Sequence, residues 1–152
     1  MTVQTGPLQG TTPVSVLLVE DDPGDVLMTR EAFENFTIDN TLHVVCDGVE
    51  AMAFLRHEGA YADSATPDLV LLDLNLPRMD GREVLAAIKN DAVLRQIPVV
   101  VLTTSEAEED VQRSYQLHAN AYVTKPVDFD RFVEVVRAID DFFVTVSRRP
   151  RA

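Results

Sequence analysis

The chain has 152 residues, 46% of them hydrophobic, and a formal net charge of −12. This length suits one domain with a full hydrophobic core, and the apolar fraction argues against wholesale disorder. The negative charge argues against nucleic acid or an anionic membrane as the main partner, because such partners attract basic patches.

Cys46 is the only cysteine, so no disulfide can form within the chain. Because the sequence contains neither an apolar run long enough to span a bilayer nor a signal-peptide pattern, we expect a cytoplasmic protein. Cys46 lies in an apolar run that indicates a strand, and we expect it to be a buried structural thiol.

Residues 1–13 are rich in Thr, Gln, Gly and Pro without an apolar period, which predicts a flexible tail. Residues 14–146 alternate strand and helix signals five times and are expected to form one domain, with a C-terminal tail over 147–152. The strands are expected over residues 14–19, 41–46, 68–72, 97–102 and 120–124. A helix is expected after each strand, and the last, over 128–146, is long.

The predicted strands are apolar throughout, which is typical of parallel sheets covered on both faces. Five strand–helix units with right-handed crossovers predict a three-layer, doubly wound α/β sandwich. Periodicity alone leaves the order of the strands open.

Polar residues gather where the predicted strands end, and the carboxyl ends of parallel strands share one edge of a sheet. These residues are Glu20, Asp21 and Asp22 after the first strand, Asp73 after the third, Thr103 and Thr104 after the fourth, and Lys125 after the fifth. Carboxylates that close cannot all stay ionised without a cation, and Mg²⁺ is the hard, oxygen-binding ion we expect. A lysine and a hydroxyl beside a metal-bound aspartate suit the oxygens of a phosphoryl group. Asp73 would then be a nucleophile that forms an acyl phosphate.

Each of these residues also has a purely structural explanation. Asp22 precedes Pro23 at a helix start and is expected to be a cap, and Asp80 likewise. Thr103 alone would be an ordinary strand residue, and Lys125 with the proline after it an ordinary turn. The joint pattern favours a site, because the groups fall at successive strand ends.

Four motifs resemble the receiver domain of two-component response regulators. They are Val19-Glu20-Asp21, Leu72-Asp73-Leu74-Asn75-Leu76-Pro77-Arg78-Met79-Asp80-Gly81, Leu102-Thr103 and Tyr122-Val123-Thr124-Lys125-Pro126. The resemblance covers residues 14–146 and implies a flavodoxin-like, five-stranded parallel sheet in the order 2-1-3-4-5. It implies a switch that takes a phosphoryl group from a sensor histidine kinase. Such a switch assists its own phosphorylation and dephosphorylation but is no enzyme with a separate substrate.

The resemblance also implies a metal site beside the phosphoacceptor. Asp73 would accept the phosphoryl group. Asp21 and Asp73 would bind Mg²⁺ directly and Glu20 through water, while Asn75 would offer its backbone carbonyl.

Three further residues correspond to the family's switch. Thr103 would hydrogen-bond the phosphoryl group, Lys125 would pair with one of its oxygens, and Tyr122 would rotate inward as Thr103 moves. A half-buried strand aromatic is the structural alternative for Tyr122. Thr104 is bulkier than the Ala or Gly that many receivers carry, so we expect it to narrow access to Asp73 and slow phosphoryl transfer.

The last predicted helix carries more apolar residues than one core-facing stripe needs. The excess is Val135, Phe142, Phe143 and Val146. Such a surface indicates an interface, and a wide core stripe is the alternative. This extension resembles the stand-alone regulators that partner bacterial phytochromes and related sensor kinases. Because those proteins dimerise through their fourth and fifth units, we expect a homodimer and a bacterial phytochrome as a candidate kinase.

Two other function classes compete with this interpretation. A Mg²⁺-dependent phosphatase of the haloacid dehalogenase type would need a second aspartate, as general acid, two residues after Asp73, where this chain has Asn75. A flavodoxin-like cofactor protein would need a Ser/Thr/Gly-rich phosphate loop after the first strand. This chain instead has Glu20, Asp21 and Asp22 there, and such an acidic loop repels phosphate unless a metal intervenes.

Overall fold

The computed structural model describes residues 14–34, 40–103 and 121–124, with the single positions 119, 130 and 134. Both expected tails, 1–13 and 147–152, lie outside these residues. The expected last helix, 128–146, also lies outside the described residues, apart from Asp130 and Glu134, which are helical.

Strands and helices alternate along the described chain. The elements are β1 (Val14–Val19), α1 (Pro23–Glu34), β2 (Asn40–Val45), α2 (Gly48–Leu55), the 3-10 turn η1 (Gly59–Tyr61), β3 (Leu69–Asp73), α3 (Gly81–Lys89), the 3-10 turn η2 (Leu94–Gln96), β4 (Val99–Thr103) and β5 (Ala121–Thr124). All neighbouring strands are parallel, in the order β2-β1-β3-β4-β5. The predicted doubly wound fold and the strand order implied by the family resemblance are therefore confirmed.

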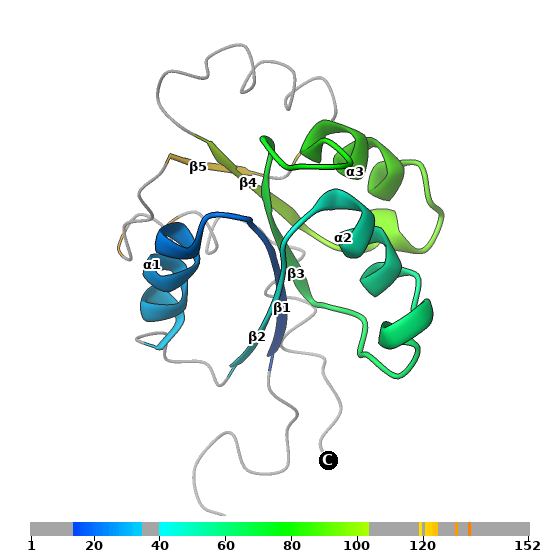
Figure 1. Ribbon diagram of the computed structural model, residues 1–152, viewed down its shortest axis with the longest axis horizontal. Helices are drawn as coiled ribbons and strands as arrows, with labels where there is room; N and C mark the ends of the chain where they lie inside the picture. The colour runs from blue at the N-terminus through cyan, green and yellow to red at the C-terminus, as the bar shows by residue number, and fades with distance from the viewer. Residues whose placement is uncertain are drawn as a thin grey trace, which may run out of the picture.

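The sheet separates two apolar layers. In Figure 1, α1 lies on one side of the sheet, and α2 and α3 lie on the other. Along β1, Leu17 and Val19 join the cluster under α2 and α3, whereas Val16 and Leu18 join the cluster that contains Phe33 of α1. β1 and β3 are buried along their whole length, and apart from Ser15 and Asp73 their residues are apolar on both faces.

The helix starts explain several of the acidic residues. Asp22 accepts hydrogen bonds through Oδ1 from the backbone N–H groups of Gly24 (2.8 Å) and Asp25 (3.3 Å) at the start of α1. Asp80 forms a reciprocal capping box with Glu83 at the start of α3. The predicted capping roles of Asp22 and Asp80 are confirmed.

The expectation of a buried strand thiol at Cys46 is wrong. β2 ends at Val45, and Cys46 is exposed. The Val45 carbonyl still accepts the Glu20 N–H from β1 (3.0 Å), but the Cys46 N–H donates to the Glu50 carboxylate in α2 (2.8 Å) and not to a neighbouring strand. Cys46 therefore belongs to the turn before α2.

Candidate functional site

The predicted acidic cluster forms where β1 and β3 end side by side. Val19 pairs with Leu72, so the next residues along the two strands, Glu20 and Asp73, lie side by side where the strands end. One ligand oxygen each from Glu20, Asp21 and Asp73 lies within 4.8 Å of the others. Since hard divalent cations bind several carboxylate oxygens at once, this donor set fits such an ion.

The three carboxylates differ in their access to water. Glu20 is 1% exposed and Asp73 is 5% exposed, whereas Asp21 is exposed. Two buried carboxylates at this separation repel each other more strongly than two solvated ones, because the protein interior screens charge poorly. A cation that enters past Asp21 would relieve this repulsion.

Backbone hydrogen bonds orient the two buried carboxylates. The Asp22 N–H donates to Oε2 of Glu20 (3.2 Å), and the Asn75 N–H donates to Oδ1 of Asp73 (3.1 Å). Each bond spans two residues and closes a local turn. Asn75 therefore lies directly beside the Asp73 carboxylate, but the metal contact expected of its carbonyl stays a prediction.

Two glycines let helices approach the segment after β3. A Cβ atom on Gly81 would lie 2.3 Å from the Asp73 carbonyl oxygen, and one on Gly48 would lie 2.1 Å from the Met79 carbonyl oxygen. The Gly81 N–H donates to the Leu74 carbonyl (3.0 Å). These close approaches were not predicted from the sequence, although each glycine follows an aspartate at a predicted helix start.

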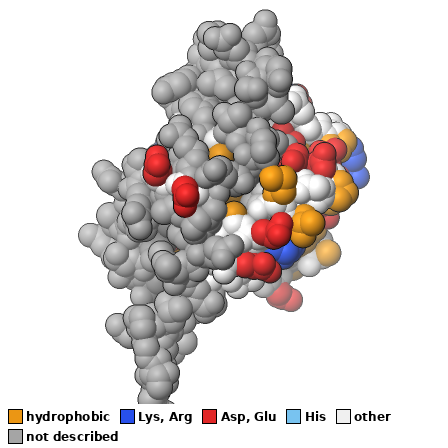
Figure 2. All heavy atoms as spheres, turned by 90° about the vertical axis from the view of Figure 1, so that its left-hand side faces the viewer, with side chains coloured by type: hydrophobic (Ala, Val, Ile, Leu, Met, Phe, Trp, Pro, Cys, Tyr) orange, Lys and Arg blue, Asp and Glu red, His pale blue; other side chains and the backbone are white. Residues whose placement is uncertain are grey.

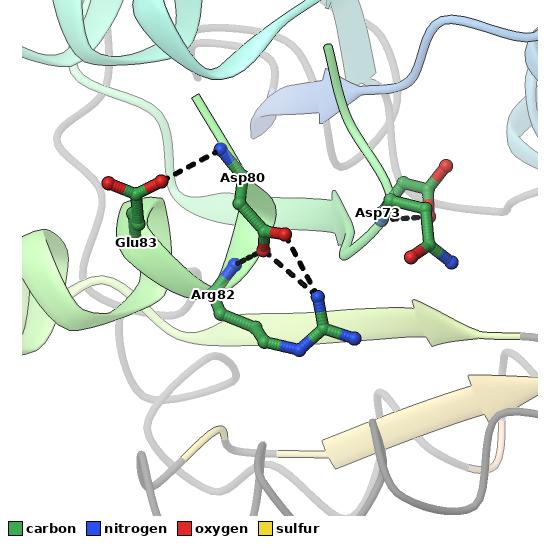
Figure 3. A network of polar contacts seen from close by, with 5 residues as sticks. Asp73, Asp80, Arg82 and Glu83 are labelled. Carbon is green, nitrogen blue, oxygen red and sulfur yellow. Dashed lines mark hydrogen bonds and ion pairs between the residues drawn. The ribbon is translucent and has the colours of Figure 1, made fainter. Parts of the chain in front are cut away.

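Asp80 takes no part in the acidic cluster. Its carboxylate accepts the Arg82 backbone N–H (2.7 Å), and both its oxygens lie 3.0 Å from Nη1 of Arg82. Figure 3 shows the Asp80 carboxylate turned toward Arg82, while its backbone N–H faces Glu83. Asp73 is thus the aspartate of this segment that joins Glu20 and Asp21.

The backbone of β4 and β5 continues the same edge of the sheet. Asp73 pairs with Leu102, and Thr103, one position further along β4, pairs with Thr124. This register places the Thr103 backbone next to the acidic cluster, and Lys125 directly follows Thr124 in the sequence.

Several predicted site residues lie outside what the structure describes. For Thr103 and Tyr122 only the backbone is described, and Thr104 and Lys125 are not described at all. The same holds for the expected interface residues Val135, Phe142, Phe143 and Val146. The roles implied for these residues stay predictions.

Comparison with known proteins identifies the family. The response regulator receiver domain matches residues 16–137. The chain belongs to this family. A curated relative, the response regulator Rcp1 of Synechocystis, is 47% identical over 140 residues, which cover 92% of this chain and 95% of the relative.

Solved structures of phytochrome response regulators share the fold. The phosphorylated cyanobacterial phytochrome response regulator RcpA has a TM-score of 0.75 and 47% identity, and covers 91% of this chain and 99% of its own. The Mn²⁺-bound form of Rcp1 has a TM-score of 0.74 and 47% identity, with coverage of 91% and 99%. The bacteriophytochrome response regulator RtBRR has a TM-score of 0.78 and 42% identity, with coverage of 85% and 79%.

These findings confirm the receiver-domain interpretation. The chain is a receiver-domain response regulator of two-component signalling, a class of switches that bind divalent metal and interact with histidine kinases. They do not favour the phosphatase alternative. Among the described residues, no helix combines the length and apolar character needed to cross a bilayer.

The contact between Gly81 and Asp73 generates a first prediction. Gly81→Ala should lower the free energy of unfolding by about 2 kcal/mol, because the new methyl group forces backbone atoms apart. It should also weaken divalent-metal binding, since the displaced carbonyl belongs to Asp73 itself. Urea denaturation and a Mn²⁺ titration measure the two effects.

Gly24→Ala is the matched control for this substitution. Its Cβ would approach only the Asp22 side chain, at 3.2 Å, and Gly24 lies in the first turn of α1 as Gly81 lies in that of α3. We expect a stability change within about 0.5 kcal/mol. A Gly81→Ala variant as stable as the wild type would contradict the close contact.

Proposed function

We propose that this response regulator accepts a phosphoryl group onto Asp73 from the phosphohistidine of a sensor kinase, with Mg²⁺ as its cofactor. The observation that carries the proposal is the convergence of Glu20, Asp21 and Asp73 within 4.8 Å at the end of two buried strands. The Mn²⁺-bound form of the relative Rcp1 supports a divalent ion at such a site.

The chemistry follows from the arrangement of these groups. An oxygen of Asp73 attacks the phosphorus atom and forms the new phosphorus–oxygen bond, while the phosphorus–nitrogen bond breaks. The imidazole nitrogen keeps the electron pair of that bond and takes a proton from water. The ion, when bound, neutralises charge that develops on the phosphoryl oxygens. Asp21 and Asp73 would hold the ion directly and Glu20 through water, and Asn75 would contribute its backbone carbonyl.

Residues at the ends of β4 and β5 would convert phosphorylation into a conformational change. Thr103 and Lys125 would bind the phosphoryl oxygens carried by Asp73, and Tyr122 would turn inward as Thr103 moves. Thr104 narrows the approach to Asp73 and so slows transfer in both directions. In the sheet, Asp73 pairs with Leu102, and Thr103 is the next residue of β4. This register supports the proposed arrangement.

We further propose that the receiver domain covers residues 14–146, that it works in the cytoplasm, and that it forms a homodimer through its last helix. Val135, Phe142, Phe143 and Val146 would form that interface. Light scattering at micromolar concentration should give twice the chain mass. A single-chain mass both with and without phosphorylation would contradict the dimer.

The kinase is proposed to be a bacterial phytochrome that contacts α1. Relatives described as phytochrome response regulators support the choice of kinase. Leu27 is 59% exposed and Met28 is 40% exposed on α1, which begins just after Asp21 and Asp22. Figure 2 shows hydrophobic and acidic side chains together on the described part of this side of the molecule.

Phosphoryl transfer to Asp73 is tested with a small phosphodonor and Mg²⁺, followed by intact mass. One phosphoryl group should be added to the wild type and none to Asp73→Asn, because the amide is a far weaker nucleophile. Removal of Mg²⁺ with a chelator should abolish the addition. Asp63→Asn, which removes one exposed carboxylate elsewhere, should react like the wild type. Addition that persists in Asp73→Asn would exclude Asp73 as phosphoacceptor.

Docking on α1 is tested with Leu27→Asp. Kinase-dependent phosphorylation should fall about tenfold or more, because a buried interface anchor typically contributes over 1.4 kcal/mol. Phosphorylation by the small donor should not change. Val93→Asp is the matched control, since Val93 is 71% exposed but lies near the start of β4, at the opposite end of the strands. Equal losses in both variants would contradict docking on α1.

A further inference from the structure

The segment between β3 and α3, residues 74–80, contacts the start of α2 through an ion pair. Asp47 uses both carboxylate oxygens there. Oδ1 accepts the Glu50 N–H (2.7 Å) and caps α2, while Oδ2 lies 3.4 Å from Nε of Arg78. One side chain therefore joins a helix start to the segment that carries Asn75.

Arg78 has an unusual backbone conformation. Its φ is +67°, in the left-handed region that residues other than glycine rarely adopt. Such a conformation persists only where surrounding contacts hold it, and it is concentrated at functional segments. The Asp47 side chain is only 15% exposed, whereas that of Arg78 is 62% exposed. The carboxylate of this ion pair is thus largely buried, whereas the guanidinium is largely exposed to solvent.

The start of α2 is itself firmly held. The Glu50 carboxylate accepts the Cys46 N–H (2.8 Å) and the Tyr61 hydroxyl (2.6 Å). The hydrogen bond to Glu50, together with burial, raises the pKa of Tyr61 to about 12. The close approach of Gly48 to the Met79 carbonyl adds a steric contact to the same segment. Asp47 therefore projects from a rigid base.

This base is continuous with the acidic cluster. The Val45 carbonyl accepts the Glu20 N–H (3.0 Å), and Asp47 follows Val45 by two residues. On the other side, the Asn75 N–H donates to Asp73 (3.1 Å). The contact between Asp47 and Arg78 thus closes a ring of contacts around the edge of the sheet.

We infer that Asp47 and Arg78 are positioning residues that hold the segment 74–80 in the geometry required for metal binding. The inference rests on the proposed function, because it assigns the segment a role through Asn75 and Asp73. Neither positioning residue touches the ion or the phosphoryl group. They act through the backbone between them and the site.

Electrostatics alone and a positioning role predict opposite changes in Mg²⁺ affinity when Arg78 is replaced. A cation near a cation site repels the ion, so Arg78→Gln should tighten Mg²⁺ binding if charge alone matters. Loss of a positioning contact should weaken it instead. The sign of the change separates the two explanations, and a merely structural role would leave the affinity unchanged.

The test is a calorimetric Mg²⁺ titration of the full chain. Arg78→Gln should raise the Mg²⁺ dissociation constant about threefold to fivefold, the upper range for an ion pair of this exposure. Asp47→Asn, whose amide oxygen still caps α2, should also raise it. The double variant should bind Mg²⁺ as tightly as the single variant with the lower affinity, because both changes break the same contact. Arg78→Lys should recover part of the affinity.

Two controls separate this effect from loss of fold and from loss of charge. Arg78→Gly suits the positive φ, so it should keep the thermal stability measured without Mg²⁺ and still bind Mg²⁺ more weakly. Arg95→Gln removes one exposed positive charge from η2 and should leave the affinity unchanged or slightly tighter.

Unchanged or tighter Mg²⁺ binding in Arg78→Gln would overturn the inference, and so would additive losses in the double variant. The proposed function fails separately. Absence of Mg²⁺ binding by the wild type, or phosphorylation that persists in Asp73→Asn, would refute the function itself. Normal wild-type behaviour with an unaffected Arg78→Gln variant would refute only the positioning role.

Discussion

Repulsion between carboxylates at the end of a buried sheet governs the functional part of this molecule. Glu20 and Asp73 lie side by side at the ends of adjacent parallel strands, and both are almost completely buried. The apolar strands behind them supply no compensating charge, because β1 and β3 are covered on both faces. The fold brings these groups together, and a divalent cation would relieve their mutual repulsion. This constraint links the hydrophobic core to the chemistry.

The segment that follows Asp73 is shaped by backbone contacts more than by side chains. Gly81 brings α3 against the carbonyl of Asp73, and Gly48 brings α2 against that of Met79. A larger residue at either position would need backbone atoms to move. The two helices therefore define where the acidic cluster can lie, while their caps, Asp47 and Asp80, fix where each helix begins.

The strands of the sheet could be predicted from the sequence because burial on both faces favours long apolar runs, as in residues 16–19 of β1 and 69–72 of β3. The position of Asp73 beside Glu20 and Asp21 could also be predicted, since all three carboxylates follow apolar runs that form neighbouring strands. The strand order came from the family resemblance, because periodicity carries no information about which strands are neighbours.

Contacts between distant residues could not be predicted in the same way. Cys46 continues an apolar run, and the strand ends there because its N–H donates to the Glu50 side chain four residues further on, which the apolar pattern does not indicate. Nothing in the residue type of Arg78 predicts a positive φ, because that conformation depends on its surroundings. The glycines were visible, but the atoms they approach belong to segments more than five residues away.

The contact between Gly81 and the Asp73 carbonyl has a consequence for regulation. A helix that touches the backbone of a ligand-binding residue cannot move independently of the bound ligand. Any protein that binds α3 more tightly in one metal state than in the other must change the metal affinity by the same factor, by thermodynamic reciprocity. The target of this regulator would then act back on the switch that recruits it.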